Sequence, residues 1–315
     1  MSNAPAAAGV WTNLFPPKAK WSINEIPDQT GKVVLVTGYG GIGKETARVL
    51  LTKNAKVYVA GRNEQAGNEA VASLTKETGK KAYFLKLDLA NLKAIKASAE
   101  DFATKESKLD VLINNAGVMF PPIDKITSDG YDLQFGTNTL GHAYFTMLLL
   151  PLLRTAVKSS SDGHARVVNV SSMGHMLFFP NLDFDTFKDG PKRLTMDPQK
   201  LYGQSKFGNI VFSNELARRF GSEGIISISL HPGNIKTDLG RYSGSIQALL
   251  TNWMLYPIPL GALTQLYAAT MPEALKLNGK YMLPWARVGN PHPATAEPEF
   301  GTKLWDWVEE QVKDV

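Results

Sequence analysis

The stretch KVVLVTGYGGIGKETARVL, residues 32–50, joins an apolar β-rich run to an amphipathic segment through a glycine-rich turn. Its glycines follow the spacing G-x-G-x-x-G. Glycine permits a tight turn and lets main-chain N–H groups approach a pyrophosphate, while the helix N-terminus adds partial positive charge. An ordinary turn is the alternative, but a strand before it and a helix after it favour a dinucleotide-binding turn. The residues expected to contact the cofactor here are Gly38, Tyr39, Gly41, Ile42 and Gly43.

Strand-like and helix-like segments alternate along the rest of the chain. The predicted strands are 32–37, 56–60, 82–87, 110–114, 165–170, 224–230 and 280–283. The predicted helices are 42–53, 64–78, 91–104, 131–157 (disturbed near Pro151), 201–220 and 303–312. Strands that are apolar throughout are covered on both faces, and strand–helix alternation gives parallel pairing. We therefore predict a single α/β domain on a doubly wound, mostly parallel sheet, with ligands at the carboxyl ends of its strands.

Two insertions and an N-terminal arm complete the predicted domain organisation. Residues 1–30 form a proline-containing arm whose aromatic side chains indicate packing on the body, and residues 31–315 form the domain itself. The insertions, at about 173–200 and 238–262, are rich in large apolar and aromatic side chains. We expect them to lie over the strand ends and to bind an apolar or aromatic substrate away from water. The alternative is that they only complete the core.

Composition excludes several classes of function. The chain has 315 residues, 43% hydrophobic, and its net charge of +5 is scattered, so no nucleic-acid partner is expected. It has no cysteine, and its five histidines lack metal-ligand spacing, so no metal site is predicted. We recognise no secretory signal and no apolar run of the roughly 18 residues that span a bilayer. We expect a cytoplasmic protein, with peripheral membrane contact by residues 249–263 as an open alternative to core or pocket packing.

The end of the second predicted strand bears on the choice of cofactor. An NAD-dependent enzyme usually carries a carboxylate there for the ribose 2′-hydroxyl, but this strand ends in Gly61-Arg62. The Arg62 guanidinium can bind a 2′-phosphate, which favours NADP(H) over NAD(H). An ordinary surface arginine is the alternative.

Two further strand ends carry candidate cofactor contacts. Asp88 and Leu89 follow the third strand, where the carboxylate either accepts from the adenine amino group or caps the next helix. Asn115, Ala116 and Gly117 follow the fourth strand, and small residues there let the chain pass under a cofactor. A strand-to-loop turn is the simpler interpretation of the same residues.

Tyr202 and Lys206 are the candidate acid–base pair. They are four residues apart at the start of a predicted helix, so they lie on one helical face. A free tyrosine has a pKa of about 10, and a nearby ammonium together with the positive nicotinamide ring would favour the phenolate and lower that pKa. Such a pair suits general acid–base catalysis, although surface Tyr–Lys pairs also occur by chance.

Serine and asparagine residues add to this pair. Ser171 and Ser172 end the fifth strand, where a hydroxyl can hold a substrate oxygen against Tyr202 or simply form a turn. Asn138 lies inside the long fourth helix, although asparagine is a poor residue for a helix interior. Its position indicates a local distortion or a specific polar role, with a satisfied helix-face side chain as the alternative.

Together these residues resemble the short-chain dehydrogenases/reductases, over about residues 30–290. The set also resembles the branch of the retinol-dehydrogenase-like and WW-domain-oxidoreductase-like enzymes, without a WW domain. The residues that match the family pattern are Thr37, Gly38, Gly41–Gly43, Asn114–Gly117, Asn138, Ser172, Tyr202, Lys206, His231–Gly233 and Thr237.

The resemblance implies a Rossmann fold and a role for each matched residue. Tyr202 would exchange a proton with the substrate, Lys206 would bind the nicotinamide ribose and tune Tyr202, and Ser172, rather than Ser171, would orient the substrate oxygen. Asn138 would support a relay water. Pro232, Gly233 and Thr237 would contact the nicotinamide end of the cofactor. The helices 131–157 and 201–220 often form a dimer face in this family, so a homodimer is an open expectation.

One departure from the family pattern concerns the glycine turn. The family usually has three residues between its first two glycines, whereas here only Tyr39 and Gly40 separate Gly38 from Gly41. We expect Gly40 to supply the missing flexibility. The leading function is alcohol–carbonyl redox with NADP(H). The alternatives are a non-catalytic NADP-binding scaffold or regulator, and an enzyme like the nucleotide-sugar epimerases, for which the C-terminal part is small.

Overall fold

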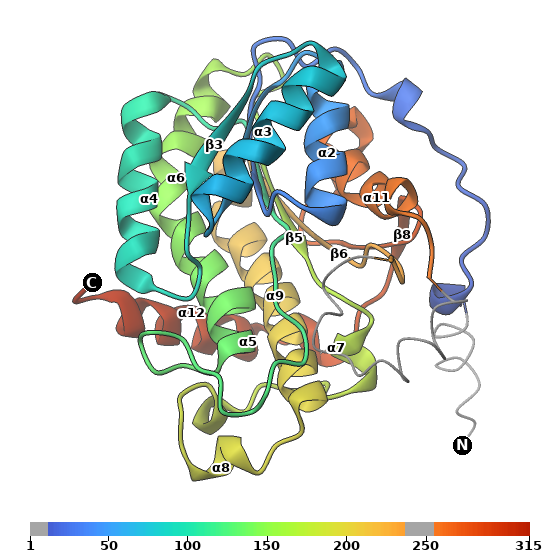
Figure 1. The fold of residues 1–315 in the computed structure, drawn as a ribbon. Helices are drawn as coiled ribbons and strands as arrows, with labels where there is room; N and C mark the ends of the chain where they lie inside the picture. Colours follow the sequence, from blue (N-terminus) through green and yellow to red (C-terminus); the bar gives the residue numbers. More distant parts are fainter. Residues whose placement is uncertain (1–11, 237–254) are drawn as a thin grey trace.

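An eight-stranded sheet runs through the computed structural model, which describes residues 12–236 and 255–315 (Figure 1). The strand order is β3-β2-β1-β4-β5-β6-β7-β8, and only the last pair is antiparallel. The strands are β1 (Val33–Thr37), β2 (Lys56–Gly61), β3 (Ala82–Lys86), β4 (Val111–Asn114), β5 (Ala165–Val170), β6 (Ile225–Leu230), β7 (Tyr281–Leu283) and β8 (Arg287–Gly289).

The strand order changes direction between β1 and β4. These two strands are paired in register, with Val36 beside Ile113, so their carboxyl ends lie next to each other. In doubly wound sheets the ligand binds in the crevice at such a point. The glycine turn follows β1, and Asn115 follows β4, so both sequence motifs lie at this crevice.

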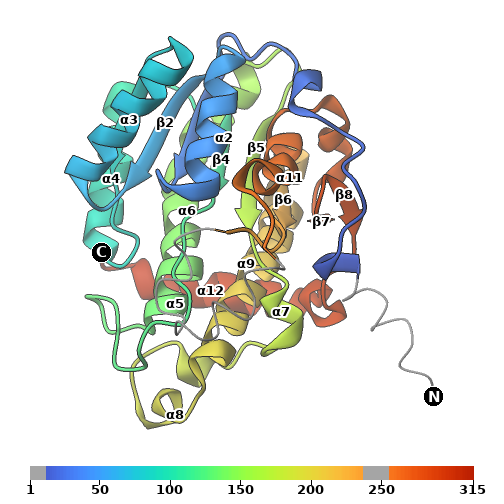
Figure 2. The same cartoon turned by 45° about the vertical axis from the view of Figure 1, so that its right-hand side comes forward.

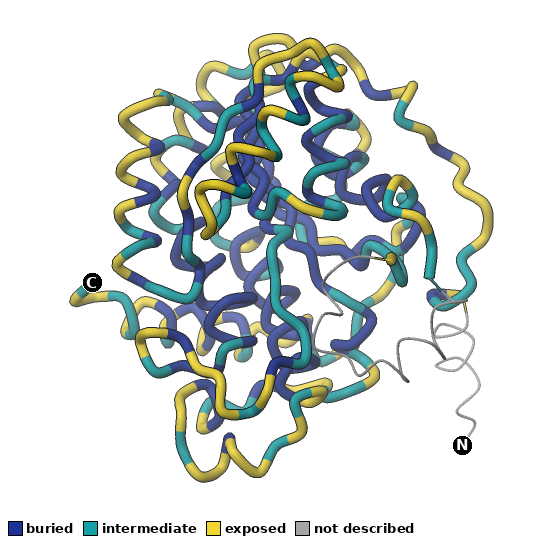
Figure 3. Tube along the Cα trace, viewed as in Figure 1, coloured by how far each residue is buried: buried dark blue, intermediate teal, exposed yellow. Residues whose placement is uncertain are grey.

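Helices cover both faces of the sheet (Figure 2). One apolar layer includes α2 (Gly41–Thr52), α3 (Glu64–Thr78) and α11 (Ile258–Thr270). The other layer includes α4 (Leu92–Lys105), α6 (Gly141–Ser159) and α9 (Pro198–Phe220). Figure 3 shows that the strands and the inward helix faces are buried while the outer helix faces are exposed. The predicted fold class is therefore confirmed, because apolar strands covered on both faces require this layered arrangement.

A further helix, α12 (Pro298–Val312), packs on the outside of α9 and α6. Its Leu304, Trp305 and Val308 are buried, and the Trp305 ring stacks on Phe212 of α9 with centroids 5.7 Å apart. Helix α12 therefore packs on the two helices that the family resemblance assigns to a dimer contact.

The sequence analysis did not predict strand β8 or helix α11, and it misjudged one helix. Strand β8 has only three residues, too short for a recognisable pattern. Helix α11 is buried on nearly all sides, so it lacks the one-sided periodicity that identifies a surface helix. Pro151 was expected to disturb the long fourth helix, but α6 continues through it to Ser159, held by the buried side chains of Leu150 and Leu153.

The long fourth helix is irregular at a different place. It begins as α5 (Leu133–Phe135), passes through the π-helical turn η2 (Gly136–Leu140), and continues as α6. The Gly141 N–H donates to the carbonyl of Gly136 five residues earlier, which inserts one extra residue into the turn. Asn138 lies in the middle of this turn, so the predicted local distortion is present.

The first insertion is folded, and only part of the second is described. Residues 173–200 contain α7 (Gly174–Leu177), η3 (Phe184–Thr186) and α8 (Pro191–Leu194). Of the expected insertion at 238–262, residues 237–254 lie outside the described part, and 258–262 belong to α11. In the arm, Trp21 packs edge-on against Tyr267 of α11, with ring centroids 5.4 Å apart.

One helical stretch among the described residues, Leu133–Ser159, is long and apolar enough by composition to cross a membrane. The sequence analysis did not expect such a stretch. In this fold 61% of its most apolar window is buried inside the protein. The stretch thus packs as a core helix, and its composition by itself is weak evidence for a span.

Candidate active site

The glycine turn is shaped by two positive φ angles. Gly38 has φ +92° and Gly41 has φ +49°, a region that side-chain-bearing residues rarely adopt. Gly40 has an extended φ of −124°, and a Cβ there would meet nothing within 4 Å. The expectation that Gly40 supplies the missing flexibility is therefore wrong, because Gly38 and Gly41 make the bend.

The third glycine of the motif allows close packing. A Cβ on Gly43 would lie 2.5 Å from the carbonyl oxygen of Gly38 and 2.6 Å from Nδ2 of Asn115. Helix α2 therefore starts directly against the end of β1. Its first N–H groups, including those of Ile42 and Gly43, face the crevice as a helix N-terminus that favours an anion.

Thr37 joins the turn to the end of β4. Its Oγ1 accepts hydrogen bonds from the main-chain N–H groups of Asn115 and Ala116, both at 2.9 Å. In return, Asn115 Nδ2 donates to the carbonyl of Thr37 at 2.8 Å. The two strand ends at the crevice are thus held together by polar contacts that the sequence analysis did not identify.

The end of β2 lies against the Tyr39 ring and is followed by the exposed side chain of Arg62. Gly61 lies against the ring of Tyr39, so that a Cβ at this position would overlap the ring. Arg62 follows at the surface with its side chain exposed. The described residues place no carboxylate on this strand end, since β2 ends at Gly61 and is followed by Arg62 and Asn63.

The structure at the end of β3 bears on the two roles expected for Asp88, which were adenine binding and capping of the next helix. Its Oδ1 accepts from the N–H of Ala90 at 3.0 Å in a local turn. Asn91, rather than Asp88, caps α4, because Asn91 Oδ1 accepts from the N–H of Ala94. Leu89 is buried, and its carbonyl lies against Gly141 at the start of α6.

Tyr202 and Lys206 lie together inside the protein, in the first turns of α9. Both are nearly fully buried, and Lys206 Nζ is 5.9 Å from the centroid of the Tyr202 ring. Nζ donates to the carbonyl of Val170, at the end of β5, at 3.0 Å. A Cβ on Gly117 would lie 3.5 Å from Nζ and 3.1 Å from Oδ1 of Asn138, so the end of β4 passes directly over both side chains.

Burial dominates the ionisation of this pair. It raises the pKa of Tyr202 to about 12, although a hydrogen bond with Ser172 acts in the opposite direction. Burial also lowers the pKa of Lys206 to about 8. The expected lowering of the tyrosine pKa is therefore absent from the protein alone, because removal from water disfavours the phenolate more than the neighbours stabilise it.

The two serines at the end of β5 have different partners. Ser172 forms the hydrogen bond with Tyr202 and accepts from the N–H of Gly174 at 3.1 Å. Ser171 points the other way, and its Oγ donates to the carbonyl of Lys206 at 2.7 Å. The structure therefore brings Ser172, and not Ser171, to the tyrosine hydroxyl.

The Asn138 side chain is fully engaged within the protein. Oδ1 accepts from the N–H of Val118 at 2.8 Å, while Nδ2 donates to the Val118 carbonyl at 3.0 Å and to Ser205 Oγ at 2.9 Å. Ser205 Oγ in turn donates to the carbonyl of Tyr202 at 2.8 Å. Asn138 thus ties the chain after β4 to the tyrosine helix.

Phe120 is an aromatic residue beside Tyr202 that the sequence analysis missed. Its ring makes edge-on contacts with Tyr202, at a centroid distance of 5.2 Å, and with Phe178 of the insertion, at 5.8 Å. Its φ of +53° is an unusual value for a bulky side chain. The N–H of Phe120 donates to Gln134 Oε1 at 3.0 Å, and Gln134 Nε2 donates to the carbonyl of Pro198. No sequence pattern signals this strained conformation.

The rest of the insertion is divided between the pocket wall and the core. Phe178 faces Phe120, whereas Phe187 is fully buried and stacks on Phe135 of α5 at 3.6 Å. Phe184 packs on Phe187 and on Trp307 of α12. The core interpretation therefore holds for Phe184 and Phe187, while a substrate-binding role for the insertion stays a prediction.

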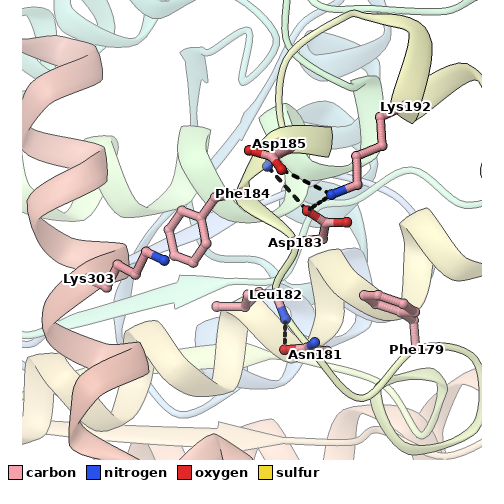
Figure 4. Close-up of a pocket in the computed structure, with 8 residues that line it drawn as sticks. All are labelled: Phe179, Asn181, Leu182, Asp183, Phe184, Asp185, Lys192 and Lys303. Carbon is pink, nitrogen blue, oxygen red and sulfur yellow. Dashed lines mark hydrogen bonds and ion pairs between the residues drawn. The ribbon is translucent and has the colours of Figure 1, made fainter.

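A shallow hollow of about 280 Å³ opens on this insertion (Figure 4). In it Lys192 bridges Asp183 and Asp185, and Lys303 of α12 lies over the Phe184 ring. The residues that line it are Phe179, Asn181, Leu182, Asp183, Phe184, Asp185, Lys192 and Lys303. None belongs to the set around Tyr202, so this hollow is separate from the candidate active site.

The end of β6 closes the other side of the crevice. Gly233 has φ +94°, and a Cβ there would lie 2.8 Å from the Trp285 ring. Pro232 lies beside it, half-buried, where a nicotinamide contact is expected. Thr237, the third expected contact of this segment, lies outside the described residues.

Comparisons with known proteins agree with this arrangement. A family model described as short chain dehydrogenase matches residues 32–182. A short-chain dehydrogenase/reductase of Armillaria gallica is 51% identical over 96% of this chain and 97% of its own length. An uncharacterised oxidoreductase of Schizosaccharomyces pombe is 42% identical over 90% of this chain and 85% of its own.

Solved structures show the same fold. A crystal structure of an uncharacterised Mycobacterium paratuberculosis protein matches with a TM-score of 0.70 and 29% identity, over 94% of this chain and 98% of that one. The complex of Pseudomonas aeruginosa RhlG with NADP matches with a TM-score of 0.64 over 80% of this chain and 94% of that one. At 23% identity, the second match concerns the fold alone.

Proposed function

The chain belongs to the short-chain dehydrogenase/reductase family of oxidoreductases, and we propose that it interconverts a carbonyl compound and its alcohol with NADP(H). The observation that carries the proposal is the convergence of Tyr202, Ser172 and Lys206 under Gly117, next to the crevice between β1 and β4. A hydroxyl pair and a buried ammonium at one point are what proton transfer to a carbonyl oxygen requires.

The residues of the crevice fit a dinucleotide. The glycine turn offers free N–H groups at the start of α2 for a pyrophosphate. The absence of a side chain on Gly117 lets the main chain after β4 approach Lys206 and Asn138 closely. When bound, the reduced cofactor supplies the hydride.

The protein's own groups then handle the proton. Tyr202 holds its hydroxyl proton at neutral pH, because burial raises its pKa to about 12. It gives this proton to the substrate oxygen, and Ser172 donates a hydrogen bond to the same oxygen. The Lys206 ammonium stabilises the phenolate that remains and supplies the proton that restores it. A protonated tyrosine at rest favours carbonyl reduction near neutral pH.

The choice of NADP(H) rests on the end of β2. Arg62 is exposed next to Gly61, and the strand end itself carries no carboxylate for a ribose 2′-hydroxyl. A guanidinium at this place binds a 2′-phosphate through paired hydrogen bonds.

The substrate is proposed to be apolar or aromatic. The Phe120 ring contacts both Tyr202 and Phe178, so a carbonyl group at the tyrosine hydroxyl has aromatic surface beside it. Aromatic pairs of this kind contribute about 0.5–1.5 kcal/mol beyond the burial of their area.

The decisive experiment is to follow NADPH oxidation spectroscopically with a panel of aldehydes, ketones and quinones. We expect turnover with aromatic carbonyl compounds, more slowly with NADH, and its loss in Tyr202→Phe with NADPH binding retained. Binding without turnover on every substrate would instead support a non-catalytic scaffold.

A further inference from the structure

Two buried histidines, to which the sequence analysis gave no role, contact the main chain of candidate catalytic residues in the same way. His142 lies on the first turn of α6, four residues after Asn138, and is 3% exposed. His175 lies in α7, three residues after Ser172, and is fully buried. Each forms its hydrogen bonds through both ring nitrogens, one to a nearby carbonyl and one to a distant segment.

The partners of His142 fix its tautomer. Nδ1 is 3.0 Å from the carbonyl oxygen of Asn138, which can only accept, so Nδ1 carries the proton. Nε2 is then a bare acceptor for the hydroxyl of Thr37 at 2.9 Å. This agrees with the other bonds of Thr37, whose Oγ1 accepts from the N–H groups of Asn115 and Ala116. His142 therefore links the π turn to Thr37, Asn115 and Ala116, which together form the floor of the crevice between β1 and β4.

The partners of His175 fix the same tautomer. Nδ1 donates to the carbonyl oxygen of Ser172 at 2.5 Å, and Nε2 accepts from the main-chain N–H of His292 at 3.1 Å. His292 belongs to the C-terminal segment, 117 residues away in sequence. His175 therefore joins the serine beside Tyr202 to a part of the chain that also carries α12.

Neither ring is suited to proton transfer. Burial lowers the pKa of both His142 and His175 to about 4, so both are neutral at physiological pH. Both nitrogens of each ring are already engaged with protein partners. Each ring therefore acts as a fixed link between two segments, with one hydrogen bond on each nitrogen, and we call such a link a strut.

We propose that His142 and His175 are positioning residues, which hold the main chain of Asn138 and of Ser172 in register with distant segments and so set the geometry around Tyr202. The proposal rests on the proposed function, because it assigns the two rings to that reaction. A displacement of about 1 Å at a reacting centre can lower a rate by about 10²-fold, so the loss of such a strut is measurable.

Isosteric substitutions separate the two ends of each strut. Asparagine places an amide N–H near the position of Nδ1 and keeps the contact with the local carbonyl, whereas glutamine reaches the Nε2 position and keeps the distant contact. Phenylalanine removes both. His164 is half-exposed and directly precedes β5, at the amino-terminal end of the strand and away from the candidate active site. His164→Asn therefore serves as a control substitution.

The experiment measures kcat, KM, the dissociation constant of NADPH by fluorescence, and the melting temperature of each variant. We expect His175→Phe and His175→Gln to lower kcat about tenfold or more with KM for NADPH unchanged, and His175→Asn to restore most of it. His142→Phe should lower kcat and also weaken NADPH binding severalfold, because it releases Thr37 and the Asn115–Ala116 floor.

Several results would overturn the inference. If all His175 variants lost kcat only in proportion to melting temperature, or if Asn and Gln behaved alike, the ring would be structural. Unchanged NADPH affinity in His142→Phe would remove the link to the floor. An inactive wild-type protein would refute the proposed function instead, and the NADPH binding of the His142 variants would still test the strut.

Discussion

The hydroxyl of Ser171 donates to the main-chain carbonyl of Lys206 at 2.7 Å, deep inside the protein. This bond joins the end of β5 to α9 one residue before the strand delivers Ser172 to Tyr202. Two adjacent serines therefore serve different purposes, one fastening the helix and the other facing the reaction.

The first prediction compares these serines. Ser172→Ala should lower kcat about 10²-fold, as the loss of a hydrogen bond made to a reacting oxygen does. Ser171→Ala should lower stability by about 1 kcal/mol through one lost buried hydrogen bond, with a smaller effect on kcat. Steady-state kinetics and denaturant unfolding of both variants check this. Equal losses of kcat in the two variants would contradict the division of roles.

The second prediction concerns the strained Phe120. Phe120→Gly and Phe120→Ala both remove the ring, but only glycine adopts a φ of +53° without steric strain. We expect both to lower kcat/KM for aromatic substrates about tenfold, with the glycine variant about 1 kcal/mol more stable than the alanine variant. Urea unfolding and kinetics on aromatic and aliphatic aldehydes provide the measurements. Equal losses on both aldehyde classes would exclude an aromatic wall.

The third prediction is a pH dependence. Lys206 is protonated below its pKa of about 8, while Tyr202, with a pKa of about 12, stays protonated throughout the range of the assay. The rate of carbonyl reduction should therefore be level near pH 6–7 and fall as pH rises through about 8. Lys206→Arg keeps its charge and should shift this fall to higher pH, at a lower overall rate. An unchanged profile in this variant would assign the titration to another group.

The fourth prediction tests cofactor choice. Arg62→Asp replaces a cation with an anion where the 2′-phosphate is expected, and supplies a carboxylate for a 2′-hydroxyl. The KM for NADPH should rise about 10²-fold or more, while the KM for NADH falls or stays level. Arg62→Gln serves as the neutral control, with an intermediate effect on NADPH alone. Equal effects on both cofactors would refute phosphate recognition.

The fifth prediction concerns the oligomeric state. Helix α12 covers α9, and a Cβ on its Gly301 would lie 2.8 Å from Glu215 Oε2, so the two helices are in close contact. We expect light scattering to give the 34.5 kDa mass of one chain, because α12 packs on both helices that the family resemblance assigns to a dimer contact. A stable dimer that substitutions on exposed positions of α6 disrupt would show that α12 leaves enough of that face free.

The fold was predictable because its signals are local. Apolar strands, their spacing and the glycine turn depend on short segments, and all seven predicted strands are present within about one residue. The pairing of Tyr202 with Lys206 was also local, since helical spacing alone places them on one face.

The remainder of the site depends on contacts distant in sequence. His175 contacts His292, and Thr37 contacts both His142 and Asn115. Thr37 and His142 are 105 residues apart in the sequence. The φ of Phe120 is set by Gln134 and Pro198 together. The burial that raises the pKa of Tyr202 in the protein alone could not be predicted, because the sequence identifies the neighbours of this side chain but not how far it is removed from water.

The π turn at Gly136–Leu140 sets the rotational alignment of the long fourth helix. One extra residue rotates α5 by about 100° relative to α6, since an α-helix has 3.6 residues per turn. Phe135, which precedes this turn directly, stacks on Phe187. Deleting a single residue here would straighten the helix and turn Phe135 away from Phe187, which removes a contact that holds residues 173–200. The position of this insertion therefore depends on the number of residues in another element.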